Sequence, residues 1–118
     1  MGNPIKEKSY KFAIRIVNLY KYLNEEKSEY ILSKQLLRSG TSIGANVAES
    51  QAAQSNADFV NKLNIALKET LESKYWIELL TETNYLTIEQ GKSLLNDCTE
   101  IENILAQIVK TTKERHGL

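Results

Sequence analysis

Residues 39–57 read Ser39-Gly40-Thr41-Ser42-Ile43-Gly44-Ala45-Asn46-Val47-Ala48-Glu49-Ser50-Gln51-Ala52-Ala53-Gln54-Ser55-Asn56-Ala57, with one charge in a chain that is 25% charged. Gly40, Gly44, Ala48 and Ala52 recur every four residues and would share one face of a helix. Each glycine inside a helix costs about 1 kcal/mol relative to alanine, so two glycines need compensation. Close approach of a second helix supplies it through dispersion contacts. We therefore expect a close-packing stripe, either in one continuous helix or in a helix that breaks near Gly40, with Ser42 capping the part that follows.

A second, polar line runs along the same segment. Ser42, Asn46 and Glu49 follow one another at steps of four and three, and Glu49 is the only charge among them. Together with Glu72 further along the chain, they form either an internal hydrogen-bond network or a site for a ligand or partner. Buried polar groups require partners, so the network is the interpretation that we favour.

Apolar residues elsewhere recur with helical period, and the chain contains one proline and five glycines. The pattern predicts helices over about 9–23, 29–54, 57–83 and 87–113, with Ser28 and Asn56 as caps and a frayed end from Arg115. Thr87 and Gln90 have the spacing of a capping box. Short connections between long helices force antiparallel neighbours. We predict an all-α, antiparallel, up-down-up-down four-helix bundle that forms a single domain over residues 1–118.

The last predicted helix carries the inner residues of a left-handed bundle. These residues alternate steps of three and four: Gly91, Leu94, Cys98, Ile101, Leu105, Ile108 and Thr112. The chain also has more aromatic residues than one slim core accommodates. Tyr75 and Trp76 are adjacent and point about 100° apart, so one can face the core and the other a neighbouring molecule.

Composition sets the class of protein. Fifteen basic and fifteen acidic residues cancel, and no apolar run is long enough to span a bilayer. One cysteine fits a reducing compartment, and the start of the chain lacks the apolar stretch of a signal peptide. We therefore expect a cytoplasmic protein.

The residues for most catalytic chemistry are missing. The one histidine, His116, lies near the end of the chain, and Cys98 has no histidine to activate it. No Glu-x-x-His motif encodes a di-iron site, and Gly40-Thr41-Ser42-Ile43-Gly44 lacks the ending of a P-loop. We predict no enzyme, no cofactor and no metal. An enzyme that uses Glu49 or Glu72 would require both carboxylates in one accessible pocket.

Ser42-Ile43-Gly44-Ala45-Asn46-Val47-Ala48-Glu49 resembles the signature of the bacterial four helix bundle family, also called the 23S rRNA intervening-sequence protein family. The later segments Ser55-Asn56-Ala57-Asp58-Phe59 and Lys62-Leu63-Asn64-Ile65-Ala66-Leu67 extend the resemblance over nearly the whole chain. The resemblance implies a small helical bundle that assembles as a pentamer. It also implies kinship with the accessory variability protein of diversity-generating retroelements, a basic pentamer that binds reverse transcriptase and nucleic acid.

The chain departs from the family pattern at two places. Ser50 replaces the usual glycine, and the basic residue common shortly afterwards is missing from 51–54. The second departure moves any nucleic-acid contact away from this segment. Basic residues gather instead near both ends of the chain, which an up-down-up-down bundle brings to one end: Lys6, Lys8, Lys11, Lys110, Lys113 and Arg115. These residues either form a nucleic-acid contact or are ordinary solvated termini.

We therefore expect a non-catalytic, homo-oligomeric scaffold or adaptor that binds another macromolecule, with a protein as the first candidate partner. Nucleic-acid binding through the basic end is the alternative.

Overall fold

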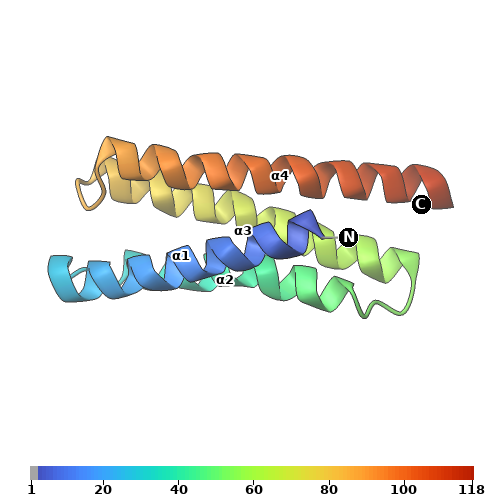
Figure 1. Cartoon of the computed structure of the whole chain (residues 1–118), viewed down its shortest axis with the longest axis horizontal. Helices are drawn as coiled ribbons and strands as arrows, with labels where there is room; N and C mark the ends of the chain where they lie inside the picture. Colours follow the sequence, from blue (N-terminus) through green and yellow to red (C-terminus); the bar gives the residue numbers. More distant parts are fainter. Residues whose placement is uncertain (1–2) are drawn as a thin grey trace.

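The computed structural model describes residues 3–118 and contains four helices in chain order: α1 (Pro4–Lys27), α2 (Leu32–Ser50), α3 (Asn56–Glu82) and α4 (Ile88–His116). The helices run alternately up and down the long axis, so that the start of α1 and the end of α4 lie at the same end (Figure 1). The predicted all-α four-helix arrangement is confirmed. Residues 1 and 2 of the predicted domain lie outside the described part.

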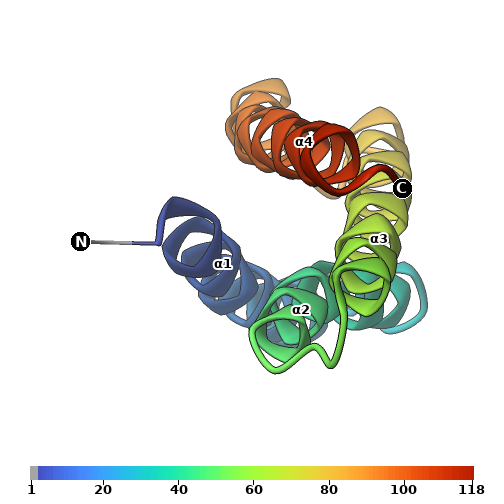
Figure 2. The same ribbon diagram turned by 90° about the vertical axis from the view of Figure 1, so that its right-hand side faces the viewer.

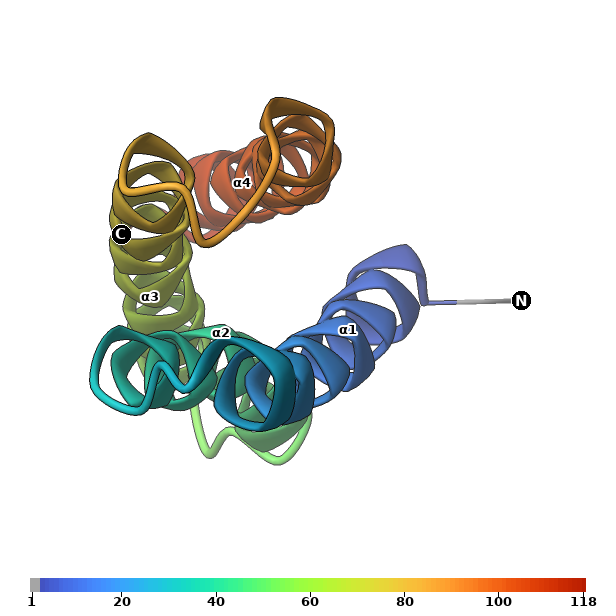
Figure 3. The same cartoon turned by 90° about the vertical axis from the view of Figure 1, so that its left-hand side faces the viewer.

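The four helices lie around an open arc when viewed along the bundle (Figure 2). α2 packs between α1 and α3, and α3 packs between α2 and α4. α1 and α4 have far less contact with each other than these neighbours have, and the opposite view shows the same opening between them (Figure 3). The bundle therefore has three well-packed helix pairs and one loose side, where α1 faces α4.

Close packing fixes α1 on α2. A Cβ atom at Gly40 would lie 2.9 Å from Cγ1 of Ile16, and one at Gly44 would lie 3.3 Å from the carbonyl oxygen of Ser9. α2 is one continuous helix through both glycines, so the alternative of a break near Gly40 is wrong. Ala48 and Ala52, the other half of the predicted stripe, are exposed. Only the glycine half of the stripe packs within the chain.

Polar contacts join α2 to α3. The Ser73 hydroxyl donates to the Ser39 hydroxyl at 3.0 Å, and both serines are buried. Hydroxymethyl groups are small enough to let the two helices approach and still satisfy each other's hydrogen bonds.

Helix ends account for most differences from the predicted ranges. α1 begins five residues earlier, at Pro4, because the Asn3 side chain accepts from the Lys6 amide and proline suits the first turn. It continues through 24–27 to Lys27, because these polar residues are adequate helix formers. α2 ends at Ser50. In the turn that follows, amides donate to the carbonyl three residues earlier, which tightens the turn.

The predicted cap at the start of α2 is wrong. Ser28 does not cap α2 but ends α1, in the left-handed conformation with φ of 51°. Glu29 caps α2 instead: its carboxylate accepts from the amides of Ile31, Leu32 and Ser33 at 3.0, 3.0 and 2.7 Å. Burial acts to raise the pKa of Glu29, but these hydrogen bonds outweigh it and hold the pKa below its usual value.

The start of α3 shows a similar shift of one residue. Ser55, not Asn56, accepts from the Asp58 amide, at 3.0 Å. A serine directly before an asparagine offers two equivalent cap residues to sequence reasoning, and only the backbone conformation distinguishes them.

Of the two predictions for the ends of α4, one is confirmed and the other is wrong. The Thr87–Gln90 capping box is confirmed, with hydrogen bonds of 2.9 and 3.1 Å. The predicted frayed end is wrong, because α4 continues to His116 and Gly117 closes it with φ of 64°.

Near the end of α4, the predicted inner residue Ile108 is only half-buried, and its neighbour Val109 is buried instead. A straight helix has 3.6 residues per turn, so its inner face drifts away from a strict seven-residue repeat.

We predict that Gly40→Ala lowers the free energy of unfolding, measured by chemical denaturation. Overpacking against Ile16 costs about 1–3 kcal/mol, whereas the gain in helix propensity is about 1 kcal/mol. In an Ile16→Ala background the added methyl has room, and there Gly40→Ala should stabilise the protein. A stabilising effect of Gly40→Ala in the wild-type background would contradict this packing.

Candidate functional site

The loose side of the bundle carries the candidate site, which we call the α1–α4 seam. One cavity of about 280 Å³ is lined by Lys8, Lys11, Phe12 and Arg15 of α1 and by Asp97, Glu100 and Ile101 of α4. A second, of about 310 Å³, continues along the seam and is lined by Arg15, Asn18, Leu19, Tyr22, Leu86, Gln90 and Leu94. Arg15 lines both cavities, so they follow one another along the same two helices.

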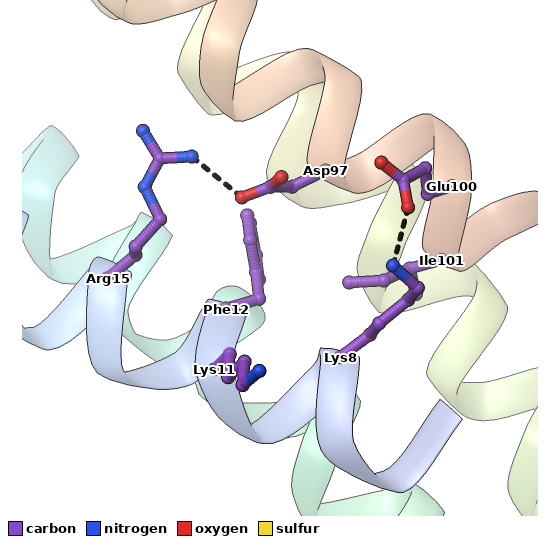
Figure 4. A pocket seen from close by; sticks show the side chains of 7 residues that line it. All are labelled: Lys8, Lys11, Phe12, Arg15, Asp97, Glu100 and Ile101. Atoms are coloured by element: carbon purple, nitrogen blue, oxygen red, sulfur yellow. Dashed lines mark hydrogen bonds and ion pairs between the residues drawn. The ribbon is translucent and has the colours of Figure 1, made fainter. Parts of the chain in front are cut away.

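The two walls of the seam have opposite charge. Figure 4 shows Lys8 of α1 reaching across to Glu100 of α4, and Arg15 reaching to Asp97. Lys8 Nζ lies 2.6 Å from Glu100 Oε2, and Arg15 Nη1 lies 2.7 Å from Asp97 Oδ2. The hydrogen bond and the charge of Glu100 raise the pKa of Lys8 above its usual value. The ion pairs therefore bridge the two helices where they pack least.

The interior of the first cavity is apolar. Phe12 and Ile101 are buried, and both belong to the core. Both ion pairs are partly exposed to solvent. Exposed pairs of this kind contribute little net stability, because water competes for each charge. The seam thus combines an apolar floor with a charged rim that opens at small cost.

The predicted polar line does not form one network in the chain. The Ser42 hydroxyl donates to the Arg38 carbonyl at 2.7 Å, and the Asn46 amide donates to the Ser42 carbonyl at 2.9 Å. Glu49 is exposed and pairs with Lys62 at 3.0 Å. The buried Ser39–Ser73 pair is an interior polar contact between helices that the sequence reasoning missed.

Glu72 lies apart from Glu49. Glu72 and Glu69 both bind the Arg38 guanidinium, and Glu69 does so at 2.9 Å. None of the four cavities described in residues 3–118 is lined by either Glu49 or Glu72. The convergence that an enzyme based on these two carboxylates requires is absent from those cavities.

The predicted basic residues are divided between two environments. Lys8 is paired across the seam and Lys11 lines it. Lys6, Lys110, Lys113 and Arg115 are exposed at the end of the bundle where α1 starts and α4 ends (Figure 1). Among the described residues, no ion pair involves any of these four.

Two further predictions concern single residues. Cys98 is buried in the core, as its place on the inner face of α4 predicts. Trp76 packs against the core while Tyr75 is exposed, and their rings meet edge to face, with centroids 4.9 Å apart. The prediction that one ring of the pair faces the core is confirmed, and contact of the other with a neighbouring molecule stays a prediction.

Sequence reasoning also missed the acidic wall of the seam. Asp97 and Glu100 each precede an inner residue of α4, Cys98 or Ile101. Charges beside the inner positions of a bundle helix commonly pair with an adjacent helix. This spacing can be read from the sequence, but it does not identify the helix with which Asp97 and Glu100 pair.

Within residues 3–118, no group of three or more histidine, cysteine, aspartate or glutamate side chains is placed to hold a metal ion. No helix in that part of the chain has both the length and the apolarity to cross a membrane.

We predict that Cys98 is chemically inert in the folded protein. Burial raises the pKa of its thiol to about 12. Since the thiolate is the reactive form, labelling by a thiol reagent at pH 8 should be on the order of 100-fold slower or more than in denaturant. Equal labelling rates for native and unfolded protein would show that the thiol is accessible.

Comparison with known proteins agrees with this architecture. A crystal structure of a protein of unknown function from the S23 ribosomal protein family of Bacteroides thetaiotaomicron VPI-5482 is 60% identical, with a TM-score of 0.89. The match covers 90% of this chain and 98% of that chain. No curated protein matches. The model of the 23S rRNA-intervening sequence protein family matches residues 3–107, and the chain therefore belongs to this family.

Proposed function

We propose that this protein is a non-catalytic, cytoplasmic helical scaffold or adaptor that forms a homo-oligomer and binds another macromolecule along the α1–α4 seam. The observation that carries the proposal is the seam itself: an apolar floor between two helices, rimmed by cations on one side and anions on the other. The resemblance to the four helix bundle family implies a pentamer as the assembly.

The seam is long enough for an amphipathic helix of about four turns. Its lining extends from Lys8 to Tyr22 on α1, which is about 21 Å at the helical rise of 1.5 Å per residue. Peptide helices commonly bind by laying their apolar face into such a groove. Acidic residues on one edge of the incoming helix would replace Glu100 and Asp97 as partners of Lys8 and Arg15. Basic residues on its other edge would form ion pairs with the carboxylates of Asp97 and Glu100.

We predict that charge reversal on the seam removes partner binding. Lys11→Glu combined with Arg15→Glu places two acids on the cationic wall, where the acidic edge of the partner would lie. Lys34→Glu combined with Lys68→Glu makes the same change in charge at exposed residues that line neither seam cavity. The measurement is affinity purification from the native cell, with nuclease treatment to separate protein partners from nucleic acid.

The control variant should retain the partner after nuclease treatment and the seam variant should lose it, with unchanged helical circular dichroism for both. Retention by the seam variant would exclude the seam as the binding surface. Light scattering on the wild-type protein tests the oligomer separately: a mass near the 13.4 kDa of one chain would refute it.

A second candidate is nucleic-acid binding at the basic end. What favours it is the exposure of Lys6, Lys110, Lys113 and Arg115 at one end of the bundle. Repetition of this end around an oligomer would multiply the phosphate contacts. The acids Glu7 and Glu114 lie in the same region and weaken its field.

We predict that, if this candidate holds, the protein retards RNA or DNA in electrophoretic mobility shifts at low salt. Triple replacement of Lys110, Lys113 and Arg115 by alanine should then weaken binding, because each phosphate contact adds to affinity. Replacement of Lys21, Lys27 and Lys34, which lie towards the opposite end, is the matched control. No retardation at micromolar protein would remove the candidate.

A further inference from the structure

The two cavities of the α1–α4 seam differ in the charge of their linings. The first is lined by three cations and two anions: Lys8, Lys11, Arg15, Asp97 and Glu100. In the described part of the chain, the second has Arg15 as its one charged lining residue, and its other polar lining residues are Asn18, Tyr22 and Gln90. Along α1 the seam therefore has a charged half, over residues 8–15, and an uncharged half, over residues 18–22.

In the charged half, the cations outnumber the anions by one. Lys8 pairs with Glu100 at 2.6 Å, and Arg15 pairs with Asp97 at 2.7 Å. Lys11 lies three residues after Lys8 and four before Arg15, so all three share one face of α1. Among residues 3–118, no ion pair involves Lys11. The charged half therefore has one positive charge in excess, at Lys11.

The surroundings of Lys11 favour a carboxylate that is carried by an apolar body. Figure 4 shows Lys11 beside Phe12 on α1, between the two ion pairs that reach across to α4. Long cationic side chains present hydrocarbon stems as well as charge. An occupant of this half therefore contacts apolar surface with its body, and its own net charge must be negative to complement the excess cation.

The uncharged half accepts no charge for a physical reason. Leu19, Leu86 and Leu94 line it. An ionised group placed over these leucines loses water and finds no opposite charge beyond Arg15, which Asp97 already neutralises. The amide and hydroxyl groups beside the leucines can instead exchange hydrogen bonds with uncharged polar side chains.

We propose that the occupant of the seam is an amphipathic helix of net negative charge, with its charged residues confined to the half that covers residues 8–15. Three acids at helical spacing match the three cations of α1, and two bases on the other edge match the two carboxylates of α4. The remaining half carries apolar and uncharged polar residues. This inference rests on the proposed function and names the chemistry of the partner.

The test uses three synthetic helical peptides of roughly 16 residues, which span about 24 Å. All three share one apolar stripe and carry a fluorescent label. The first has three glutamates and two lysines in one half, on opposite edges, and serine and glutamine in the other half. The second exchanges every glutamate for lysine and every lysine for glutamate. The third is the first peptide with two further glutamates in its uncharged half. Fluorescence anisotropy at low salt gives the Kd of each.

The wild-type protein should bind the first peptide about tenfold more tightly than the second, because the exchange turns attraction into repulsion along both edges. It should also bind the first more tightly than the third, because the added carboxylates would lie over leucines.

A single substitution on α1 tests the role of the excess cation. Lys11→Glu leaves two cations and three anions around the first cavity, so this variant should prefer the second peptide to the first. Lys34→Glu makes the same change at an exposed residue that lines neither cavity, and it should keep the wild-type preference. Both substitutions are at exposed residues, so both variants should keep the helical circular dichroism of the wild type.

Tighter or equal binding of the second peptide by the wild type, or an unchanged preference in Lys11→Glu, would overturn the acidic partner. Binding of the third peptide as tightly as the first would overturn the division into two halves, and binding of none of the peptides would overturn the inference as a whole. In each case the proposed function stands if charge reversal on the seam still removes the cellular partner, so the two failures are distinguishable.

Discussion

Two glycines on α2 bring α1 into near-backbone contact, and that contact sets which sides of α1 are left to face α4 and solvent. Gly40 receives Ile16, and Gly44 lies against the backbone of Ser9. Glycine is unfavourable inside a helix, by about 1 kcal/mol relative to alanine, so its presence here reflects the contact it permits. With α1 seated on α2, the helix is turned so that its two remaining sides face α4 and solvent.

Those two sides differ in chemistry and therefore in what they can bind. Towards α4, α1 presents cations over an apolar floor, and ion pairs with Asp97 and Glu100 span a seam that helix packing leaves loose. Towards solvent it presents the exposed apolar side chains of Tyr10, Ile14 and Val17. In our proposal the charged side accepts a partner macromolecule.

The sequence predicts the fold well because helical period and small-residue spacing are local signals. The inner residues Leu94, Cys98, Ile101 and Leu105 of the last helix and the Thr87–Gln90 capping box are confirmed. The errors arise where small differences in backbone conformation, or contacts between residues far apart in the sequence, determine the structure. Glu29 replaces Ser28 as a cap because its longer side chain reaches forward to the amides of the next turn, where it accepts three hydrogen bonds. The acidic wall of the seam escaped prediction because spacing on α4 does not reveal which helix Asp97 and Glu100 reach.

The loose packing of α1 against α4 is the basis of the proposed binding surface. α2 and α3 each pack on two neighbours, whereas α1 and α4 each pack mainly on one. Amide hydrogen exchange tests this directly, because exchange reports local opening. Exchange should be faster in the seam segments 8–22 of α1 and 90–101 of α4 than in the central segments 36–47 of α2 and 63–77 of α3. Exchange of the seam segments as slow as that of the central segments would contradict a seam that opens to a partner.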